Sequence, residues 1–277
     1  MKSRLELLLK SYNQKKKWPI FVLIGATITI LAGLGDVLDF GKNVFEIGSK
    51  AISNFNKHEE IYKKLQKVNT GLSSDYIDQL FGKPSIIRPM GTQSQFINYI
   101  ERLYVSDLYF LYTISEKSTN KIFFYSVTTR DENFNPLLPM PSSNKNAKLR
   151  LGKATLTEIE PNQPQNVSAD ASSKFISYTE LDNFGNRGYY KDYVLGYAPA
   201  GYTKLTDEQS SIIFSFTELS RSKNREKNKL QDFRKTYSPN SFGVIGEIND
   251  NSLYEILSIG MIGIDYFDAR EFPKDSS

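Results

Sequence analysis

The chain has 277 residues, with no cysteine and a single histidine. The lack of cysteine excludes disulfide frameworks, thiolate zinc sites, cysteine nucleophiles and cysteine-ligated iron–sulfur clusters. A metal site that needs several imidazoles is excluded as well, because His58 is the only histidine. The sequence therefore predicts no catalytic residue, no metal ligand and no cofactor-binding residue.

The net charge of +4 is concentrated at the N-terminus. Residues 1–17 carry six basic side chains and one acidic side chain, whereas residues 18–277 carry 29 basic and 30 acidic side chains. Nucleic-acid binding needs many contacts from Lys and Arg to phosphates, and a nearly neutral body does not favour it. We expect no nucleic-acid partner.

Residues 18–38 form a predicted transmembrane anchor. The first 18 of them carry no charge, which corresponds to about 27 Å of helix and matches the hydrocarbon thickness of a bilayer. Lys15, Lys16 and Lys17 precede this segment and place the tail 1–17 in the cytoplasm by the positive-inside rule. The predicted location is thus the bacterial inner membrane, single-pass, with a periplasmic globular domain. A cleaved signal peptide and a buried soluble helix are the alternatives.

Small residues follow one face of the predicted anchor. Gly25, Thr29 and Gly33 recur at four-residue spacing, and such rows let two transmembrane helices approach closely. We therefore expect the membrane as one partner, with a homodimer through these three residues as a further hypothesis.

An amphipathic stalk helix is predicted from residue 40 to residue 69, where apolar side chains recur at three- or four-residue steps. His58 lies on its polar face, between Lys57 and Glu59. This position is typical of a solvated histidine, and the alternative role is pH sensing.

Residues 70–277 form the predicted globular domain, which begins with a helix from Ser74 to Phe81. Ser73 is positioned to cap this helix, and Gly82 permits a left-handed exit from it. Three segments rich in Tyr, Phe, Ile and Val follow, and they predict a meander of strands at 95–105, 108–116 and 121–130.

This part of the chain resembles a known family of modules. The motif Gly71-Leu72-Ser73, followed by Leu80-Phe81-Gly82-Lys83-Pro84 and antiparallel strands, is similar to the signature of SmpA/OmlA-like modules. Those are small envelope lipoprotein modules of the outer-membrane assembly machinery. The resemblance covers residues 70–130, so 70–131 is taken as the SmpA/OmlA-like part. The whole chain also resembles an uncharacterised bacterial family of single-anchor membrane proteins, which implies a location in the cell envelope.

Residues 132–277 form a β-rich remainder. The pattern predicts strands at 147–159, 175–181 and 189–197, and a polar, mobile segment at 161–173. Thr206 and Gln209 match a capping box, which predicts a helix from Thr206 to about Leu219. No internal repeat is visible in the sequence.

A basic stretch follows this helix and is a candidate contact for anionic lipid head groups or an acidic partner. A solvated helix end or loop is the alternative interpretation. Few aromatic residues alternate with the basic ones, so the stretch does not favour a stacking surface for single-stranded nucleic acid. The basic side chains are Arg221, Lys223, Arg225, Lys227, Lys229, Arg234 and Lys235.

Two further patterns bear on catalysis. Ser142 and Lys145 have the Ser-x-x-Lys spacing of penicillin-binding proteins, but they lie in a Pro-rich loop without a Lys-Thr-Gly partner, so chance explains them better. Asp265, Asp268 and Glu271 bring carboxylates together near the C-terminus. Paired carboxylates can cleave glycosides, whereas their alternation with aromatic residues is typical of an edge strand with ion pairs.

Together these patterns predict an α+β protein: a transmembrane helix and a stalk helix, then a mainly antiparallel β domain with a few helices. The 18 Phe and 17 Tyr supply either a β-rich core or a partner-binding face. The favoured function is a non-enzymatic, membrane-anchored interaction or scaffold protein of the bacterial envelope, whose partner is another envelope protein. The alternatives are a cytoplasm-facing membrane component of a defence or signalling system, and a carboxylate-dependent envelope hydrolase.

Overall fold

A computed structural model describes part of the chain: residues 57–90, 96–140, 148–171, 176–202, 205–218, 225–248, 250, 253–254, 257 and 269–273. The chain forms two compact units, residues 1–60 and Ile61–Ser277, and only residues 57–60 of the first are described. The predicted anchor 18–38 lies outside the described residues. None of the helices that are described is long and apolar enough to cross a membrane.

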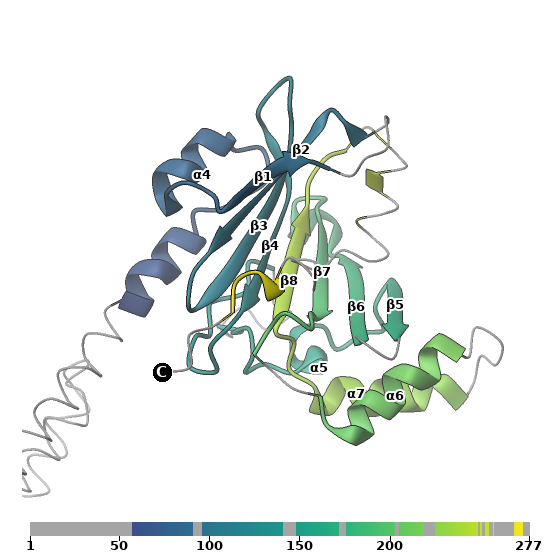
Figure 1. The fold of residues 1–277 in the computed structure, drawn as a ribbon. Coiled ribbons are helices and arrows are strands. Elements are labelled where there is room, and N and C mark those ends of the chain that lie inside the picture. Colours follow the sequence, from purple (N-terminus) through teal and green to yellow (C-terminus); the bar gives the residue numbers. More distant parts are fainter. Residues whose placement is uncertain are drawn as a thin grey trace, which may run out of the picture. The chain divides into compact units, whose positions relative to one another are not determined.

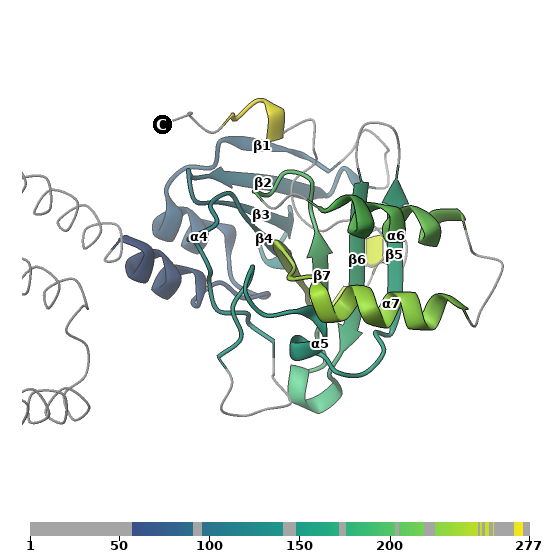
Figure 2. The ribbon, with the colours of Figure 1, turned by 90° about the horizontal axis from the view of Figure 1, so that it is seen from below.

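The second unit is built on one antiparallel sheet of eight strands, in the order β1-β2-β3-β4-β8-β7-β6-β5 (Figure 1). The expected mainly antiparallel α+β class is therefore confirmed. The strand directions turn strongly from β1 and β2 to β5 and β6, as the right-handed twist of strands requires (Figure 2). The strands are β1 Ile86–Pro89, β2 Tyr99–Val105, β3 Tyr109–Glu116, β4 Ile122–Thr129, β5 Asn166–Ala171, β6 Ile176–Asn183, β7 Asp192–Tyr197 and β8 Ser241–Ile245.

The first half of the sheet follows the sequence prediction closely. Helix α4 spans Ser74–Phe81, its first turn is capped where the side chain of Ser73 accepts from the Tyr76 N–H, and it ends at Gly82 with φ +85°. The meander β2-β3-β4 forms as expected, with a turn at residues 117–120 between β3 and β4. In the described part of the predicted stalk, residues 57–65 are helical. The helix ends before the predicted residue 69, because a turn follows at 66–67.

The second half departs from the prediction in two places. The strand predicted at 147–159 is wrong, because Thr155 and Glu158 form a capping box that starts helix α5, Leu156–Ile159. The mobile segment predicted at 161–173 is also wrong, because residues 166–171 form the edge strand β5. An edge strand needs apolar side chains on one face only, and Val167 and Ala169 supply them.

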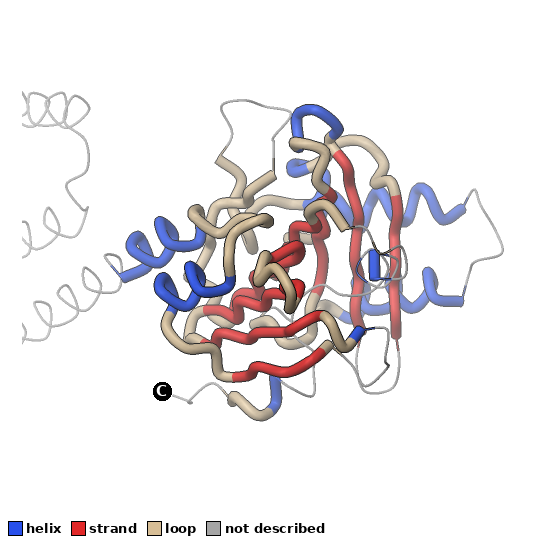
Figure 3. The backbone as a smooth tube through the Cα atoms, turned by 90° about the horizontal axis from the view of Figure 1, so that it is seen from above, coloured by secondary structure: helices blue, strands red, loops and turns tan. Residues whose placement is uncertain are grey.

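Two helices connect β7 to β8. Helix α6 spans Asp207–Glu218, and its predicted capping box is present: the Gln209 N–H donates to the Thr206 hydroxyl oxygen over 3.1 Å, and the Thr206 N–H donates to the Gln209 side chain over 3.0 Å. Helix α7 spans Arg225–Thr236. Both lie against the β5–β6 end of the sheet, away from α4 (Figures 2 and 3).

The two halves repeat one plan, although no repeat is visible in the sequence. Each has a helix followed by four strands of the sheet, α4 with β1–β4 and α5 with β5–β8, although α6 and α7 stand between the last two strands of the second half. The halves meet where β4 pairs with β8. In each half, a backbone hydrogen bond joins the segment before the helix to the segment at the start of the last strand. Gly71, with φ +89°, donates to the Ile122 carbonyl, and Gly152, with φ +74°, donates to the Pro239 carbonyl. The two halves thus share the order of a helix and four strands and the pairing of neighbouring strands.

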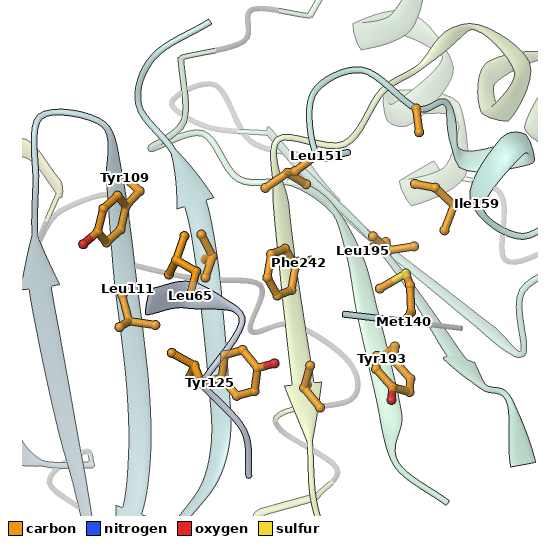
Figure 4. Packing of buried hydrophobic residues seen from close by; sticks show 14 of the residues in the cluster. Leu65, Tyr109, Leu111, Tyr125, Met140, Leu151, Ile159, Tyr193, Leu195 and Phe242 are labelled. Atoms are coloured by element: carbon orange, nitrogen blue, oxygen red, sulfur yellow. The ribbon is translucent and has the colours of Figure 1, made fainter. Parts of the chain in front are cut away.

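Both faces of the sheet are covered. On one face Leu111, Tyr125, Phe242 and Leu195 extend from β3, β4, β8 and β7 into a single layer with residues from the helical and loop segments (Figure 4). A second cluster on the opposite face includes Phe110, Phe124 and Ile245, together with described residues near the C-terminus. Because side chains alternate between faces, both sides of the central strands are buried, and β4 and β8 are buried along their whole length.

Candidate functional site

A cleft of about 990 Å³ opens at one end of the sheet, where β2, β4 and β7 begin and β3 and β8 end. We call it the tyrosine cleft, because Tyr99, Tyr189 and Tyr190 line it together with a set of charged and hydroxyl side chains. The polar lining residues are Thr70, Glu116, Thr119, Lys121, Lys191, Glu247 and Asp250.

The sheet itself forms one wall of the tyrosine cleft. The Tyr99 ring packs edge-on against Phe123, with the ring centroids 5.3 Å apart, and the Tyr99 hydroxyl donates to Asp250 Oδ2 over 3.1 Å. Burial, and then the hydrogen bond and charge of Asp250, raise the pKa of Tyr99. Tyr99 is therefore a neutral hydrogen-bonding group at physiological pH.

Two consecutive tyrosines also line the tyrosine cleft, and we call them its rim. Tyr189 and Tyr190 are 81% and 76% exposed, and their backbones have φ of +54° and +56°. Left-handed backbone is costly for a residue with a bulky side chain, and such strain persists only where the surrounding structure imposes it. Two hydrogen bonds impose it here: the Tyr190 N–H donates to the Gly185 carbonyl, and the Lys191 N–H donates to the Gly188 carbonyl.

The two residues that follow the tyrosines, Lys191 and Asp192, form hydrogen bonds with other parts of the domain. The Lys191 ammonium donates to Asn69 Oδ1 over 2.6 Å, and the Tyr254 hydroxyl donates to Asp192 Oδ2 over 2.6 Å. The backbone beneath Tyr189 and Tyr190 is thus held on both sides, while the two rings remain exposed to solvent. Such a rim presents two large aromatic side chains to solvent from a backbone that is held in place.

The charges in the cleft are mixed. Three carboxylates, from Glu116, Glu247 and Asp250, face two ammonium groups, from Lys121 and Lys191. Glu116 is used locally, because it accepts a hydrogen bond from the Thr119 hydroxyl over 2.8 Å. This lining suits a polar ligand with both kinds of charge better than a polyanion. Among the described residues, no group of three or more His, Asp or Glu side chains could hold a metal ion.

Among the residues that the structure describes, the basic side chains predicted to contact an anionic partner do not line the cleft. For one of them, Arg234, the prediction is wrong. Arg234 is completely buried, and its guanidinium donates to Glu180 Oε1 over 2.8 Å and to the carbonyls of Asn162 and Glu160 over 2.7 Å each. It is therefore an internal residue that cannot meet an external anion. Arg234 has this role because its position on α7 faces β6.

The other members of the basic stretch have different positions. Lys229 and Lys235 are exposed on α7, and the Lys235 ammonium lies 3.1 Å from Asp232 Oδ1. Arg225 and Lys227 belong to α7, but their side chains are not among those described. Arg221 and Lys223 lie outside the described residues.

Most other sequence candidates lie outside the described residues as well: Lys15, Lys16, Lys17, Gly25, Thr29, Gly33, Ser142, Lys145, Asp265 and Asp268. Glu271 is exposed, and His58 is partly exposed on the helix formed by residues 57–65. Sequence reasoning did not single out Tyr189 and Tyr190. The signal for them was the adjacent Gly185-Asn186-Arg187-Gly188 turn, which leads into two aromatic residues.

No family model and no curated protein matches the chain. A weak match among solved structures is a cysteine-rich secretory protein, SAV1118, from Staphylococcus aureus subsp. aureus Mu50, with 9% sequence identity and a TM-score of 0.34. The match covers 69% of this chain and 48% of that one, so this chain spans about half the length of its structural neighbour.

Proposed function

We propose that the domain formed by residues 61–277 binds a protein partner through the tyrosine cleft, and that the segment 18–38 anchors it in the bacterial inner membrane. In this account the protein is a non-enzymatic, membrane-anchored interaction or scaffold protein of the cell envelope. The segment between residue 40 and the domain joins it to the anchor, and the resemblance of residues 70–130 to SmpA/OmlA-like modules supports the envelope setting.

The observation that carries the proposal is the pair of strained, exposed tyrosines. Tyrosine supplies a large contact area at a low cost in side-chain entropy, and it is enriched at the centres of protein interfaces. Tyr189 and Tyr190 are 81% and 76% exposed at the rim, whereas small-molecule sites enclose their ligand within a mostly apolar cavity. A protein surface with its own apolar and charged groups fits this rim better than a small molecule.

Replacing Tyr189 and Tyr190 together by glycine is expected to weaken binding without lowering stability. Partner binding falls at least tenfold, because both rings are lost. The free energy of unfolding stays constant or rises by up to about 1 kcal/mol, because glycine adopts positive φ without strain. Quantitative co-purification of the full-length chain with its partner, paired with urea unfolding, measures both.

The matched control is the pair Tyr189→Phe and Tyr190→Phe, which keeps the rings and should keep both binding and stability. The proposal fails if the glycine variant binds as well as the parent chain. It also fails if binding and stability fall together, since that result would assign the tyrosines a role in folding.

The side of the membrane has its own test. A C-terminal alkaline phosphatase fusion is expected to be active, because the basic tail keeps the N-terminus in the cytoplasm and exports the domain. An inactive phosphatase fusion alongside a fluorescent ordinary GFP fusion would instead support the cytoplasm-facing alternative.

A further inference from the structure

A buried group of acids lies where α7 meets β6 and the end of α5, and none of its members lines the tyrosine cleft. Three carboxylates gather there, from Glu160, Glu180 and Asp182, and their residues are 6%, 0% and 6% exposed. Arg234 is the guanidinium that faces them. We call these four residues the acid cluster.

The guanidinium of Arg234 does not serve all three acids. It donates to Glu180 Oε1 and to the backbone carbonyls of Asn162 and Glu160. Glu180 Oε1 also accepts from the Tyr178 hydroxyl over 2.6 Å. The Glu160 carboxylate accepts from the Asn162 N–H over 3.0 Å and from its side-chain amide over 2.7 Å.

Two carboxylate oxygens in the acid cluster have no hydrogen-bond donor. Glu180 Oε2 and Asp182 Oδ2 are buried and without a partner among the described residues, while Asp182 Oδ1 accepts only from the Gln165 N–H over 3.2 Å. With all three acids ionised, one guanidinium would face three negative charges. Burying unpaired charge is costly, and a carboxyl in this position keeps a proton instead.

The pKa directions agree with this geometry. The pKa of Asp182 is raised from 3.8 to about 7. Burial is the largest cause, followed by repulsion from Glu180, and Glu160 adds a smaller repulsion. The Gln165 N–H and Arg234 act in the opposite direction. Burial also raises the pKa of Glu180, against the opposing effects of Arg234 and Tyr178.

We propose that the acid cluster is a proton-controlled latch, in which protonated Asp182 closes α7 onto the sheet and ionised Asp182 loosens it. Opening α7 exposes the cluster to water, where Asp182 releases its proton readily. The closed state therefore binds a proton that the open state does not hold between about pH 4 and pH 7. The extra stability that this proton gives to the closed state, relative to the open state, is fully present at the acidic end of this range. It is lost as the pH rises to about 7. The latch does not rest on the proposed function, and it couples pH to the helix that exposes Lys229 and Lys235.

Hydrogen exchange of the full-length chain tests the latch. After division by the intrinsic exchange rates, the opening equilibrium of α7 amides is expected to rise roughly 20-fold between pH 5.5 and pH 7.5, then level off near pH 8. Amides of β3 and β4 serve as an internal reference and should change less than about twofold.

Asp182→Asn mimics the protonated acid, so its α7 profile should be flat, with α7 more protected at pH 5.5 than in the parent chain and about as protected as in the parent chain near pH 4. Asp182→Ser provides a second neutral variant with a smaller side chain. Asp232→Asn is the matched control, because its carboxylate lies on the same helix with 71% of the side chain exposed, and it should keep the parent profile. A flat profile in the parent chain overturns the latch, whatever the variants do, and so does an unchanged slope in Asp182→Asn.

Discussion

Replacing Arg234 by methionine is expected to lower the free energy of unfolding by about 3–5 kcal/mol. The reason is the position of the guanidinium rather than the strength of one ion pair. The Arg234 and Glu180 side chains are both fully buried, 2.8 Å apart, and the same guanidinium also satisfies two backbone carbonyls. Removing it leaves the Glu180 carboxylate buried with the Tyr178 hydroxyl as its remaining hydrogen-bond donor among the described residues.

The double variant Arg234→Met, Glu180→Met separates this account from a simple packing effect. Because neither charge is left behind, we expect the double variant to recover at least half of the loss. Lys235→Met is the control on the same helix: its ammonium is exposed and pairs with Asp232 at the surface, so its effect should stay within about 0.5 kcal/mol. Urea unfolding of all three measures the differences. A double variant that loses at least as much as Arg234→Met alone would contradict the account.

The second large effect is expected from Gly196→Ala, with a loss of at least about 3 kcal/mol. Gly196 pairs with Thr179 where β7 meets β6. A Cβ atom on Gly196 would lie 1.8 Å from the Tyr178 carbonyl oxygen and 2.8 Å from its carbonyl carbon. These are backbone atoms that no side-chain rotation can move, so the two strands would have to separate.

Gly82→Ala is the matched comparison for this prediction. Nothing lies within 4 Å of a Cβ atom at Gly82, but its φ of +85° is left-handed, so the expected loss is about 1–2 kcal/mol from backbone strain alone. Thermal or urea unfolding ranks the two variants. Finding Gly196→Ala no more destabilising than Gly82→Ala would mean that β6 and β7 are not packed as described.

The parts of the fold that the sequence predicts correctly are those set by local chemistry. Helix α4 has the predicted bounds because Ser73 and Gly82 act within one turn of its ends. The strands β2, β3 and β4 follow from runs of aromatic and β-branched residues. Neither result depends on residues far away in the chain.

The parts that the sequence could not predict depend on distant partners. Strand β8 has five residues with a glycine at its centre, and it is a buried strand because β4 and β7 pair with its two sides. The burial of Arg234 depends on Glu180, 54 residues earlier in the chain. From the local sequence alone, Arg234 is predicted to be one more exposed basic residue of the stretch.

The candidate site was predicted only in general terms. The aromatic content predicted a β-rich core, with a partner-binding face as the alternative, and no residue of such a face could be named from it. The exposure of Tyr189 and Tyr190 follows from the two backbone hydrogen bonds that bring their segment back to Gly185 and Gly188. Those bonds form within the folded turn, so the strand predicted at 189–197 begins instead at Asp192.

Site-specific photocrosslinking tests the central claim most directly. A photoreactive amino acid is placed in the full-length chain at Thr119, an exposed position in the tyrosine cleft, or at Ile87, which is 59% exposed on β1. In cells of the source organism, the account predicts a discrete protein adduct from position 119 that disappears when Tyr189 and Tyr190 are both glycine, and none from position 87. Equal adducts from both positions, or an adduct at 119 that survives the loss of both tyrosines, would contradict it.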